Sequence, residues 1–561
     1  MLYTLNQIIS IIINGPVRRL AFAFLAGIAL ATTLPFIGFG YYAWFGLIPL
    51  ILLIKSSQSY KAASIESFLF ILAYNLVSFS WLLGLHPLTW QGFSITESTI
   101  ITGLAWILPS IFHSLVLIPF TLLTKVFFEF RTNERNYELK FVDILFLAFT
   151  WVVIEHKILL GLGPNFGVFS VPINLLVFSQ YQNKVLIQAS NTVGALGIEY
   201  IIVTTNLLLS NFFNIQRTKL GFNMSSKLNV KQPFFGVQNF QEHVKYFSIV
   251  FLVLAITMIY GLTEIKTYHT SKKKLISFAA LQADYSAAKT RTQSSSPSNL
   301  ANVQFQLSSA LKDKKDLLLW SEGAVPLFDK TKLQKDLFIK LNEKTNVFAY
   351  GTFSSIDDKV YNSVDFIEFE SPIDAKSPVT YMVDHYHKKN LVPFGEYTPF
   401  YGMFPKSIQR LADFTVGNGF DSHAEGSKPV QTKRFKIGAN ICFELLFPKL
   451  VRNQVINGAN FIVNFNDLSW FKSPFGGFMK VPHGDKNLIG ADWIKKQFLA
   501  VAVFRAVENK RDLILAGNSG YSALINSIGK VSLITEPNKI SMIEGELELR
   551  AKKSRYTLYG W

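Results

Sequence analysis

The stretch Ile437-Gly-Ala-Asn-Ile-Cys-Phe-Glu-Leu-Leu-Phe447 places the only cysteine of the 561-residue chain, Cys442, at the end of an apolar run typical of a buried strand. A single cysteine cannot form an internal disulfide, and one thiol alone is a poor structural metal site. Cys442 is therefore either a small buried hydrophobic residue, which is the commoner case, or a reactive nucleophile. The rest of the sequence favours the nucleophile.

Apolar and charged residues are segregated along the chain. The sequence is 49% hydrophobic and 17% charged, which is too apolar for an average soluble protein and too polar for a pure membrane bundle. Long apolar runs fill the first half, whereas the second half is typical of a soluble domain. We therefore predict a multi-span transmembrane domain over residues 1–268 and a soluble domain over residues 269–561.

Seven runs in the first half are candidate membrane-spanning helices. A hydrocarbon core of about 30 Å needs about 20 apolar residues in a helix. The first run follows Arg18 and Arg19 and is itself followed almost at once by a second, which favours an uncleaved anchor over a signal peptide. The predicted spans lie near 19–35, 38–54, 64–84, 98–124, 141–160, 186–212 and 245–264.

Lysine and arginine residues are distributed unevenly among the loops between these runs. They gather before the first run and after the second, fourth and sixth, whereas the loops after the first and third contain none. The positive-inside rule then predicts a cytoplasmic N-terminus and, after an odd number of spans, a soluble domain outside the cytoplasm. Topology signals and anionic lipid contacts account for much of the formal net charge of +17, so we expect a membrane partner and no nucleic acid.

Polar residues inside the predicted spans have two interpretations. Glu155, in Trp151-Val-Val-Ile-Glu155, is a candidate headgroup or helix-packing site, and an interhelical hydrogen bond explains it at least as well. His113 is better explained as a structural residue. The nine histidines show no ligand spacing, so we expect no metal site.

The second half alternates short apolar runs with polar helical stretches. Strands that alternate with helices in this way predict an α/β sandwich. The predicted strands are Leu275–Leu281, Asp316–Trp320, Val347–Thr352, Val360–Ile367, Ile437–Cys442, Asn460–Asn464, Asp512–Gly517 and Tyr521–Asn526.

Three motifs lie after or near such strands, where α/β proteins commonly place their chemistry. They hold Glu322 in Leu317-Leu-Leu-Trp-Ser-Glu-Gly-Ala-Val-Pro326, Lys388 and Glu396 in Tyr386-His-Lys-Lys-Asn-Leu-Val-Pro-Phe-Gly-Glu-Tyr-Thr-Pro399, and Cys442 in Asn440-Ile-Cys-Phe-Glu444. A carboxylate can take the proton of a thiol, and an ammonium group can stabilise both a thiolate and a developing oxyanion. Glutamate, lysine and cysteine are thus a sufficient set for acyl transfer.

These motifs resemble those of apolipoprotein N-acyltransferase, the membrane branch of the nitrilase superfamily. The resemblance covers nearly the whole chain, and Leu391-Val-Pro-Phe-Gly-Glu396 is its most specific segment. Further matches are Asn466-Asp467 with Trp470-Phe471, Arg505-Ala-Val-Glu508, Asn518-Ser-Gly520, Leu186-Ile-Gln188, Gly194-Ala-Leu-Gly197 and Asn206. The resemblance implies an α-helical transmembrane bundle followed by a nitrilase-like αββα sandwich.

The resemblance also implies a two-step reaction at the cytoplasmic (inner) membrane of a bacterium, with the sandwich in the periplasm and the chain acting as a monomer without a cofactor. Cys442 would take an acyl chain from a membrane phospholipid as a thioester. The N-terminal α-amine of a diacylglyceryl-cysteine apolipoprotein would then accept that chain as an amide. Glu322 would be the general base and Lys388 the oxyanion stabiliser, with Glu396 and Glu444 in support.

Several features depart from the pattern of this family. Phe443 follows the nucleophile where the family usually has Tyr, and Ser321 precedes the base where it usually has Pro. The segment 471–496 is longer than usual, and the chain ends at Trp561 where the family usually continues into an eighth span. Because Glu322, Lys388 and Cys442 are all present, we still expect an active enzyme.

Two aromatic loops, Pro399–Phe404 and Trp470–Phe478, are predicted to enter the membrane interface and admit acyl chains, because aromatic side chains suit that depth. Ordinary packing over the sandwich explains them nearly as well. The candidate lipid contacts are Phe400, Phe404, Trp470, Phe475 and Phe478.

Two other functions are compatible with the same residues. A membrane-tethered amidase or nitrilase would use the same three residues on a small amide or nitrile, with water resolving the thioester. An inactive paralogue would only bind acylated proteins. Seven spans exceed what an anchor requires and favour a lipid substrate, whereas an intact set of three residues argues against the inactive paralogue.

Overall fold

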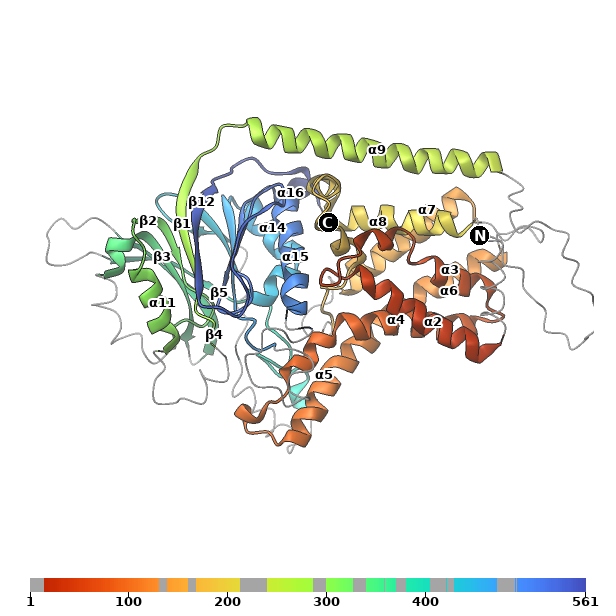
Figure 1. Ribbon diagram of the computed structural model, residues 1–561, viewed down its shortest axis with the longest axis horizontal. Helices are drawn as coiled ribbons and strands as arrows, with labels where there is room; N and C mark the ends of the chain where they lie inside the picture. Colours follow the sequence, from red (N-terminus) through yellow and green to blue (C-terminus); the bar gives the residue numbers. More distant parts are fainter. Residues whose placement is uncertain are drawn as a thin grey trace, which may run out of the picture.

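A computed structural model describes most of the chain. The described residues are 15–130, 139–159, 168–211, 240–285, 299–325, 340–357, 359–369, 380–403, 420, 428–471, 490 and 492–560. Figure 1 shows two parts, a set of helices on one side and a pair of sheets on the other, with helices α14, α15 and α16 between them. The two parts of the predicted fold class, a bundle of apolar helices and a sandwich of two sheets, are both present.

Every predicted span contains helix. The helices of the first half are α2 (Pro16–Leu30), α3 (Ile48–Ser56), α4 (Tyr60–Ser78), α5 (Ile95–Val116), α6 (Ile118–Phe130), α7 (Phe141–Ile154), α8 (Ser190–Ser210) and α9 (Phe240–Thr270). Among the described residues, five helical runs are long and apolar enough to cross a membrane, and a sixth, Gly40–Ser56, is shorter. Their number is close to the seven predicted.

Two membrane helices differ from the prediction in detail. The predicted span 98–124 is interrupted at Leu117, where α5 ends and α6 begins, and Pro119 follows at once. Proline lacks the backbone N–H that would continue the hydrogen-bond ladder of a helix, so a break is expected there. In the predicted span 141–160, α7 passes into a π-helical turn at Glu155–Leu159.

The second half forms two six-stranded sheets. One has the order β12-β1-β2-β3-β4-β5 and the other β11-β10-β9-β8-β7-β6. The strands are β1 (Leu275–Gln282), β2 (Lys315–Leu319), β3 (Thr345–Ile356), β4 (Lys359–Phe369), β5 (Thr380–His387), β6 (Val430–Gln431), β7 (Lys436–Ile441), β8 (Phe461–Asn466), β9 (Leu513–Gly517), β10 (Ala523–Ile525), β11 (Val531–Ile534) and β12 (Ser541–Glu548). All eight predicted strands are confirmed, and β5, β6, β11 and β12 were not predicted.

The two sheets face each other across a buried apolar core that includes Phe278, Val364 and Val463. Helix α11 (Asn299–Ser309) packs on the outer face of the first sheet, while α14 (Pro448–Ile456) and α15 (Trp493–Asn509) flank the second. This arrangement is the αββα sandwich that the sequence predicted.

One continuous core joins the sandwich to the membrane helices. It includes Leu207 of α8 together with Val503 of α15. Polar contacts cross the same boundary, because Gln497 Nε2 donates a hydrogen bond to Ser78 Oγ at 3.2 Å. The chain changes from helices to strands between Thr270 and Leu275, and the division at residue 268 stays a prediction.

Helix α8 is kinked where α15 approaches it. Gly194 has a φ of +69°, and a Cβ there would lie 2.8 Å from the ring of Tyr556, so only glycine fits. The N–H of Ala195, freed by the kink, donates to Glu508 Oε1 at 3.0 Å. Arg505 holds the other oxygen of Glu508 at 2.5 Å. The motifs Gly194–Gly197 and Arg505–Glu508 thus connect the two halves of the molecule.

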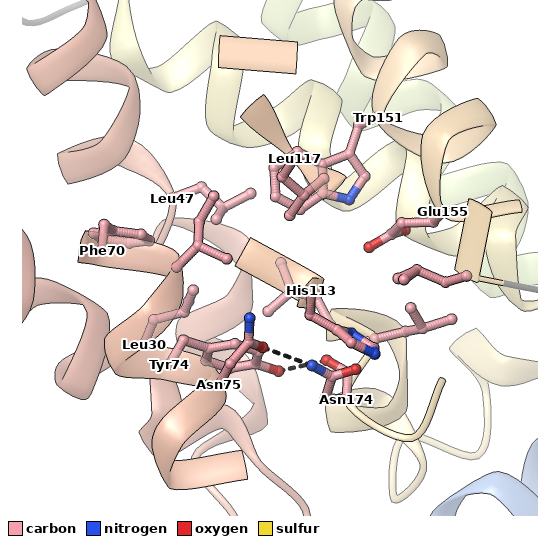
Figure 2. A pocket seen from close by; sticks show the side chains of 14 residues that line it. Leu30, Leu47, Phe70, Tyr74, Asn75, His113, Leu117, Trp151, Glu155 and Asn174 are labelled. Carbon is pink, nitrogen blue, oxygen red and sulfur yellow. Dashed lines mark hydrogen bonds between the residues drawn. The ribbon is translucent and has the colours of Figure 1, made fainter. Parts of the chain in front are cut away.

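A cavity of about 40 Å³ lies inside the membrane bundle, between α4, α5, α7 and the segment around Asn174. Figure 2 shows Glu155, Trp151 and His113 around it. His113 Nε2 accepts a hydrogen bond from the N–H of Val171 at 3.2 Å, which agrees with a structural role. Glu155 Oε2 is buried without a hydrogen-bond partner in the described part of the chain.

Candidate active site

The first part of the site is the turn that follows β2 and carries Glu322. Gly351 of β3 donates its N–H to the carbonyl of Ser321 at 3.1 Å, and a Cβ on Gly351 would lie 2.5 Å from Glu322 Cα. This close approach therefore requires glycine. Ser321 is itself buried and accepts a hydrogen bond from Gln304 at 2.7 Å. The turn is fixed from both sides, which sets the position of the Glu322 carboxylate.

Lys388 lies just after β5, with only 1% of its surface exposed. Its ammonium Nζ is 2.7 Å from Glu396 Oε1 and 3.5 Å from Glu322 Oε1. Glu396 follows in the next loop, and its second oxygen accepts the N–H of Val392 at 2.7 Å. The structure therefore brings Glu322, Lys388 and Glu396 into one buried cluster.

Cys442 stands at the turn between β7 and the 3-10 helix Cys442–Leu446, with a φ of +48°. A positive φ is uncommon for a residue other than glycine, and such strain is often found at functional sites. The carbonyl of Cys442 accepts a hydrogen bond from Asn464 of β8 at 3.1 Å. The side chain is partly buried and packs against the cores on both faces of its sheet.

The backbone N–H of Asp467 links Glu322 and Cys442. It donates to Glu322 Oε2 at 3.0 Å. It also acts on the sulfur of Cys442, where it lowers the pKa of the thiol. Asp467 follows β8, and parallel strands β7 and β8 end at the same edge of their sheet. The sheet thus delivers Cys442 and this N–H side by side.

Burial and charge perturb the titration of all three groups. Burial raises the pKa of the Glu322 carboxyl to about 7, although the Lys388 ammonium opposes it. Burial lowers the pKa of Lys388, but Glu396 and Glu322 outweigh this effect and raise it above its usual value. Burial raises the pKa of the Cys442 thiol well above its usual range, Glu322 adds to the rise, and Lys388 opposes it. The cluster therefore pairs a protonated thiol with a carboxyl that titrates near neutrality.

Glu444 is fully buried and connects the cysteine turn to the lysine loop. Its Oε1 accepts the N–H groups of Lys389 and Asn390 at 2.7 and 3.1 Å. Its Oε2 accepts the Tyr386 hydroxyl and the N–H of Ile441, both at 2.8 Å. Glu444 thereby fixes Lys388 and Cys442 relative to each other through the residues beside them.

Sequence reasoning missed one polar residue of this cluster, Asn362 of β4. Its side-chain Nδ2 donates to Glu322 Oε1 at 2.8 Å and to Glu396 Oε1 at 2.9 Å. Asn362 lies in none of the motifs that the sequence analysis singled out. The signal that could have found it is the adjacent polar pair Asn362-Ser363 inside a predicted strand.

Comparison with known proteins covers both halves of the chain. The model of the apolipoprotein N-acyltransferase N-terminal domain matches residues 26–208, and that of carbon-nitrogen hydrolase matches residues 278–546. The apolipoprotein N-acyltransferase of Rickettsia typhi is 25% identical over 500 residues, which cover 88% of this chain and 85% of that protein. The enzyme of the same name from Geobacter metallireducens is 25% identical over 558 residues, covering 97% and 92%.

The chain belongs to the apolipoprotein N-acyltransferase family. It is accordingly a bacterial membrane protein of the acyltransferase class. Among solved structures, the carbon-nitrogen hydrolase of Helicobacter pylori is 14% identical to this chain, with a TM-score of 0.35. The alignment covers 49% of this chain and 89% of the Helicobacter chain.

The departures from the family pattern are accommodated by local packing. Phe443, where the family usually has Tyr, lies edge-on against Phe447 with ring centroids 5.1 Å apart. From the long segment 471–496, the described Phe471 packs on Trp81, with centroids 4.7 Å apart, and Trp493 stacks on Phe36 at 4.7 Å. Both contacts join the sandwich to the membrane half.

Two of the five candidate lipid contacts lie in the described part of the chain. Trp470 meets Trp90 edge-on, with ring centroids 5.3 Å apart, so it contacts the membrane half. Phe400 is 44% exposed, and Phe394, earlier in the same loop, is 51% exposed. The other three lie outside the described residues, namely Phe404, Phe475 and Phe478.

Proposed function

We propose that the protein transfers an acyl chain from a membrane phospholipid to the N-terminal α-amine of diacylglyceryl-cysteine apolipoproteins through a thioester on Cys442. The observation that carries this proposal is the buried cluster of Glu322 and Lys388 beside Cys442, on a chain of the apolipoprotein N-acyltransferase family. The proposal places the catalytic domain on the periplasmic face of the inner membrane, where both lipid substrates are within reach.

In the first step, Glu322 takes the proton of the Cys442 thiol, and the thiolate attacks the ester carbonyl carbon of the phospholipid. The developing oxyanion is stabilised by the Lys388 ammonium. The ester C–O bond then breaks, Glu322 returns the proton to the leaving glycerol oxygen, and a lysophospholipid departs. Cys442 now carries the acyl chain as a thioester.

In the second step, the α-amine of the apolipoprotein attacks the thioester carbon. An α-amine has a pKa of about 8, so a useful fraction is neutral near pH 7. Glu322 takes a proton from the attacking nitrogen, the C–S bond breaks, and the thiolate of Cys442 recovers that proton. The products are an amide and the free thiol, so the enzyme is regenerated.

Exposed aromatic side chains favour this lipid chemistry over hydrolysis of a small soluble amide. Phe394 and Phe400 are 51% and 44% exposed on the loop that also carries Glu396. Phe394 stacks with Phe169 of the membrane half, with centroids 6.2 Å apart. An apolar surface at the junction of the two halves suits acyl chains that enter from the bilayer.

The test is acylation of a synthetic diacylated lipopeptide by the full-length protein in phospholipid vesicles. The proposal expects an N-acylated product with the wild-type protein and none with Cys442→Ala. Product formation by Cys442→Ala would overturn the role of Cys442. Release of free fatty acid in place of acylated lipopeptide would favour the hydrolase, and absence of both would favour the inactive paralogue.

A further inference from the structure

Asn362 contacts three members of the cluster from a single position on β4. Its side-chain nitrogen donates to Glu322 Oε1 and to Glu396 Oε1, at 2.8 and 2.9 Å. Its backbone carbonyl accepts the N–H of Lys388 at 2.8 Å. The residue is 3% exposed, so these contacts are shielded from water.

The Asn362 amide and the Lys388 ammonium share the same two oxygens. Lys388 Nζ lies 2.7 Å from Glu396 Oε1 and 3.5 Å from Glu322 Oε1. The four groups therefore form a closed ring in which two carboxylate oxygens alternate with two nitrogen donors. Lys388 favours Glu396, so Asn362 is the nearer of the two donors to Glu322 Oε1.

The orientation of the Asn362 amide is set by the two carboxylates that it contacts. Its Oδ1 is buried and has no hydrogen-bond partner among the described residues. Carboxylate oxygens accept hydrogen bonds, so the amide nitrogen must face them and the oxygen must point away. Here one end is left unpaired while the other serves two carboxylates.

We propose that Asn362 is a positioning residue of the acyl-transfer reaction, whose amide holds Glu322 and Glu396 on either side of Lys388 and keeps Glu322 ionised for proton abstraction from Cys442. This inference rests on the proposed function only through the role of Glu322 as base. Two N–H donors stabilise the charged form of a carboxylate over its neutral form. The contact from Asn362 accordingly lowers the pKa of Glu322 against the rise caused by burial.

The experiment measures the rate at which Cys442 is acylated by a p-nitrophenyl fatty ester, followed by intact mass from pH 5 to 9 on the full-length protein. Asn362→Ala removes both hydrogen bonds that the Asn362 side chain donates, to Glu322 and to Glu396. Asn362→Ser retains a hydroxyl that can donate one hydrogen bond. We expect the midpoint of the acidic limb to rise by about one pH unit in Asn362→Ala, and by less in Asn362→Ser. Above the new midpoint, the rate should recover toward that of the wild type.

Asn440 of β7 provides a matched control. It is fully buried and also has an unpaired Oδ1, but its nitrogen donates to Gln454 at 3.0 Å and contacts no carboxylate. Asn440→Ala is expected to lower the melting temperature without moving the midpoint of the pH profile. A melting curve for every variant separates unfolding of the protein from misplacement of the Glu322 carboxylate. If Asn362→Ala does not fold, Asn362→Ser is used for the same measurement.

An unchanged midpoint in a folded Asn362 variant, with the rate lowered equally at every pH, would overturn the inference and leave a structural role. Equal shifts in Asn362→Ala and Asn440→Ala would also overturn it. The activated ester replaces the phospholipid, so failure of the proposed donor or acceptor leaves this result intact. Failure of wild-type Cys442 to acylate at all would instead remove the proposed function.

Discussion

The sandwich and the cavity of the membrane bundle both bury glutamates, but the surroundings of those glutamates differ. In the sandwich, all six carboxylate oxygens of Glu322, Glu396 and Glu444 have a hydrogen-bond donor. In the bundle, Glu155 Oε2 has no hydrogen-bond donor in the described part of the chain. The nearby indole Nε1 of Trp151 has no acceptor among those residues. Elsewhere in the bundle, Glu66 is paired with Arg19, and both oxygens of Glu199 accept backbone N–H groups, so the contrast is between the Glu322 cluster and Glu155.

This difference teaches which buried carboxylates are arranged to carry charge. A buried ionised carboxylate is costly unless hydrogen bonds and a counter-charge compensate for lost water. The sandwich cluster supplies both, so a proton can leave Cys442 for Glu322 without stranding a charge. At the cavity, Glu155 Oε2 has no hydrogen-bond donor and no ion-pair partner among the described residues, which favours a packing role for that side chain.

Among the variants that test this contrast, removal of the Lys388 ammonium should have the largest effect on the rate of acyl transfer. Lys388→Ala leaves two carboxylates facing each other and removes the oxyanion stabiliser, so acyl transfer should fall by about 10³-fold or more, with about 3–5 kcal/mol lost in stability. Lys125 is fully buried in α6 and gives the matched control in the bundle. Lys125→Ala should lower the melting temperature and leave the chemical step intact, as single-turnover rates would show.

The proposed base should have the next largest effect. Glu322→Gln preserves the shape of the side chain but cannot take the thiol proton, so thioester formation should slow by about 10²–10⁴-fold. Rapid-quench mass analysis of Cys442 measures that step. A variant as fast as the wild type would show that another group removes the proton.

The pH dependence follows from the raised pKa of Glu322. This carboxyl titrates at about 7 in the folded protein and at 4.5 in an unfolded one, so the folded state favours its protonated form. Its contribution to stability is therefore complete below about pH 4.5 and is lost as the pH rises toward 7. Thioester formation needs the ionised form, so its rate should rise with pH around a midpoint near 7. A midpoint near 4.5 would contradict the burial of this group.

The aromatic pair between the two halves should have a moderate effect. Trp470 and Trp90 lie edge to face across the boundary, and such pairs contribute about 0.5–1.5 kcal/mol beyond the area they bury. Trp470→Ala should lower turnover on vesicle-bound lipopeptide by about two- to tenfold, while reaction with a short soluble ester changes less. Equal losses on both substrates would indicate a general disturbance of the site.

The cavity glutamate should have the smallest effect. Glu155→Gln keeps the size of the side chain, and distant sites act independently. The rate should stay within about twofold of the wild type, and the melting temperature should be equal or higher, because a buried carboxyl is replaced by a neutral amide. A large loss of activity at unchanged stability would give the bundle a chemical role and remove the contrast.

The sequence predicted the sandwich because apolar runs mark its buried strands. The strands it missed lack that pattern. β5 contains Asp384, His385 and His387, and β12 places glutamates at every second position near its end. Both are paired antiparallel to a neighbour and lie at the edge of their sheet, where charged side chains reach water.

The site was predicted only as far as motifs extend. Glu322, Lys388 and Cys442 each lie in a recognisable segment, and the structure brings the first two within 3.5 Å. Asn362 and the N–H of Asp467 were missed as contacts of Glu322, because they lie 40 and 145 residues away in the chain. Such pairings depend on strand order and register, which local sequence does not encode.

The most direct test of the account is the mass of Cys442 itself. Full-length protein from its own membranes is digested, and the peptide that contains Cys442 is weighed before and after a chase with diacylated lipopeptide. We predict a fatty-acyl adduct that hydroxylamine removes and that the lipopeptide accepts on its α-amine. A thiol that stays unmodified in the presence of phospholipid, or an acyl group released only to water, would contradict the account.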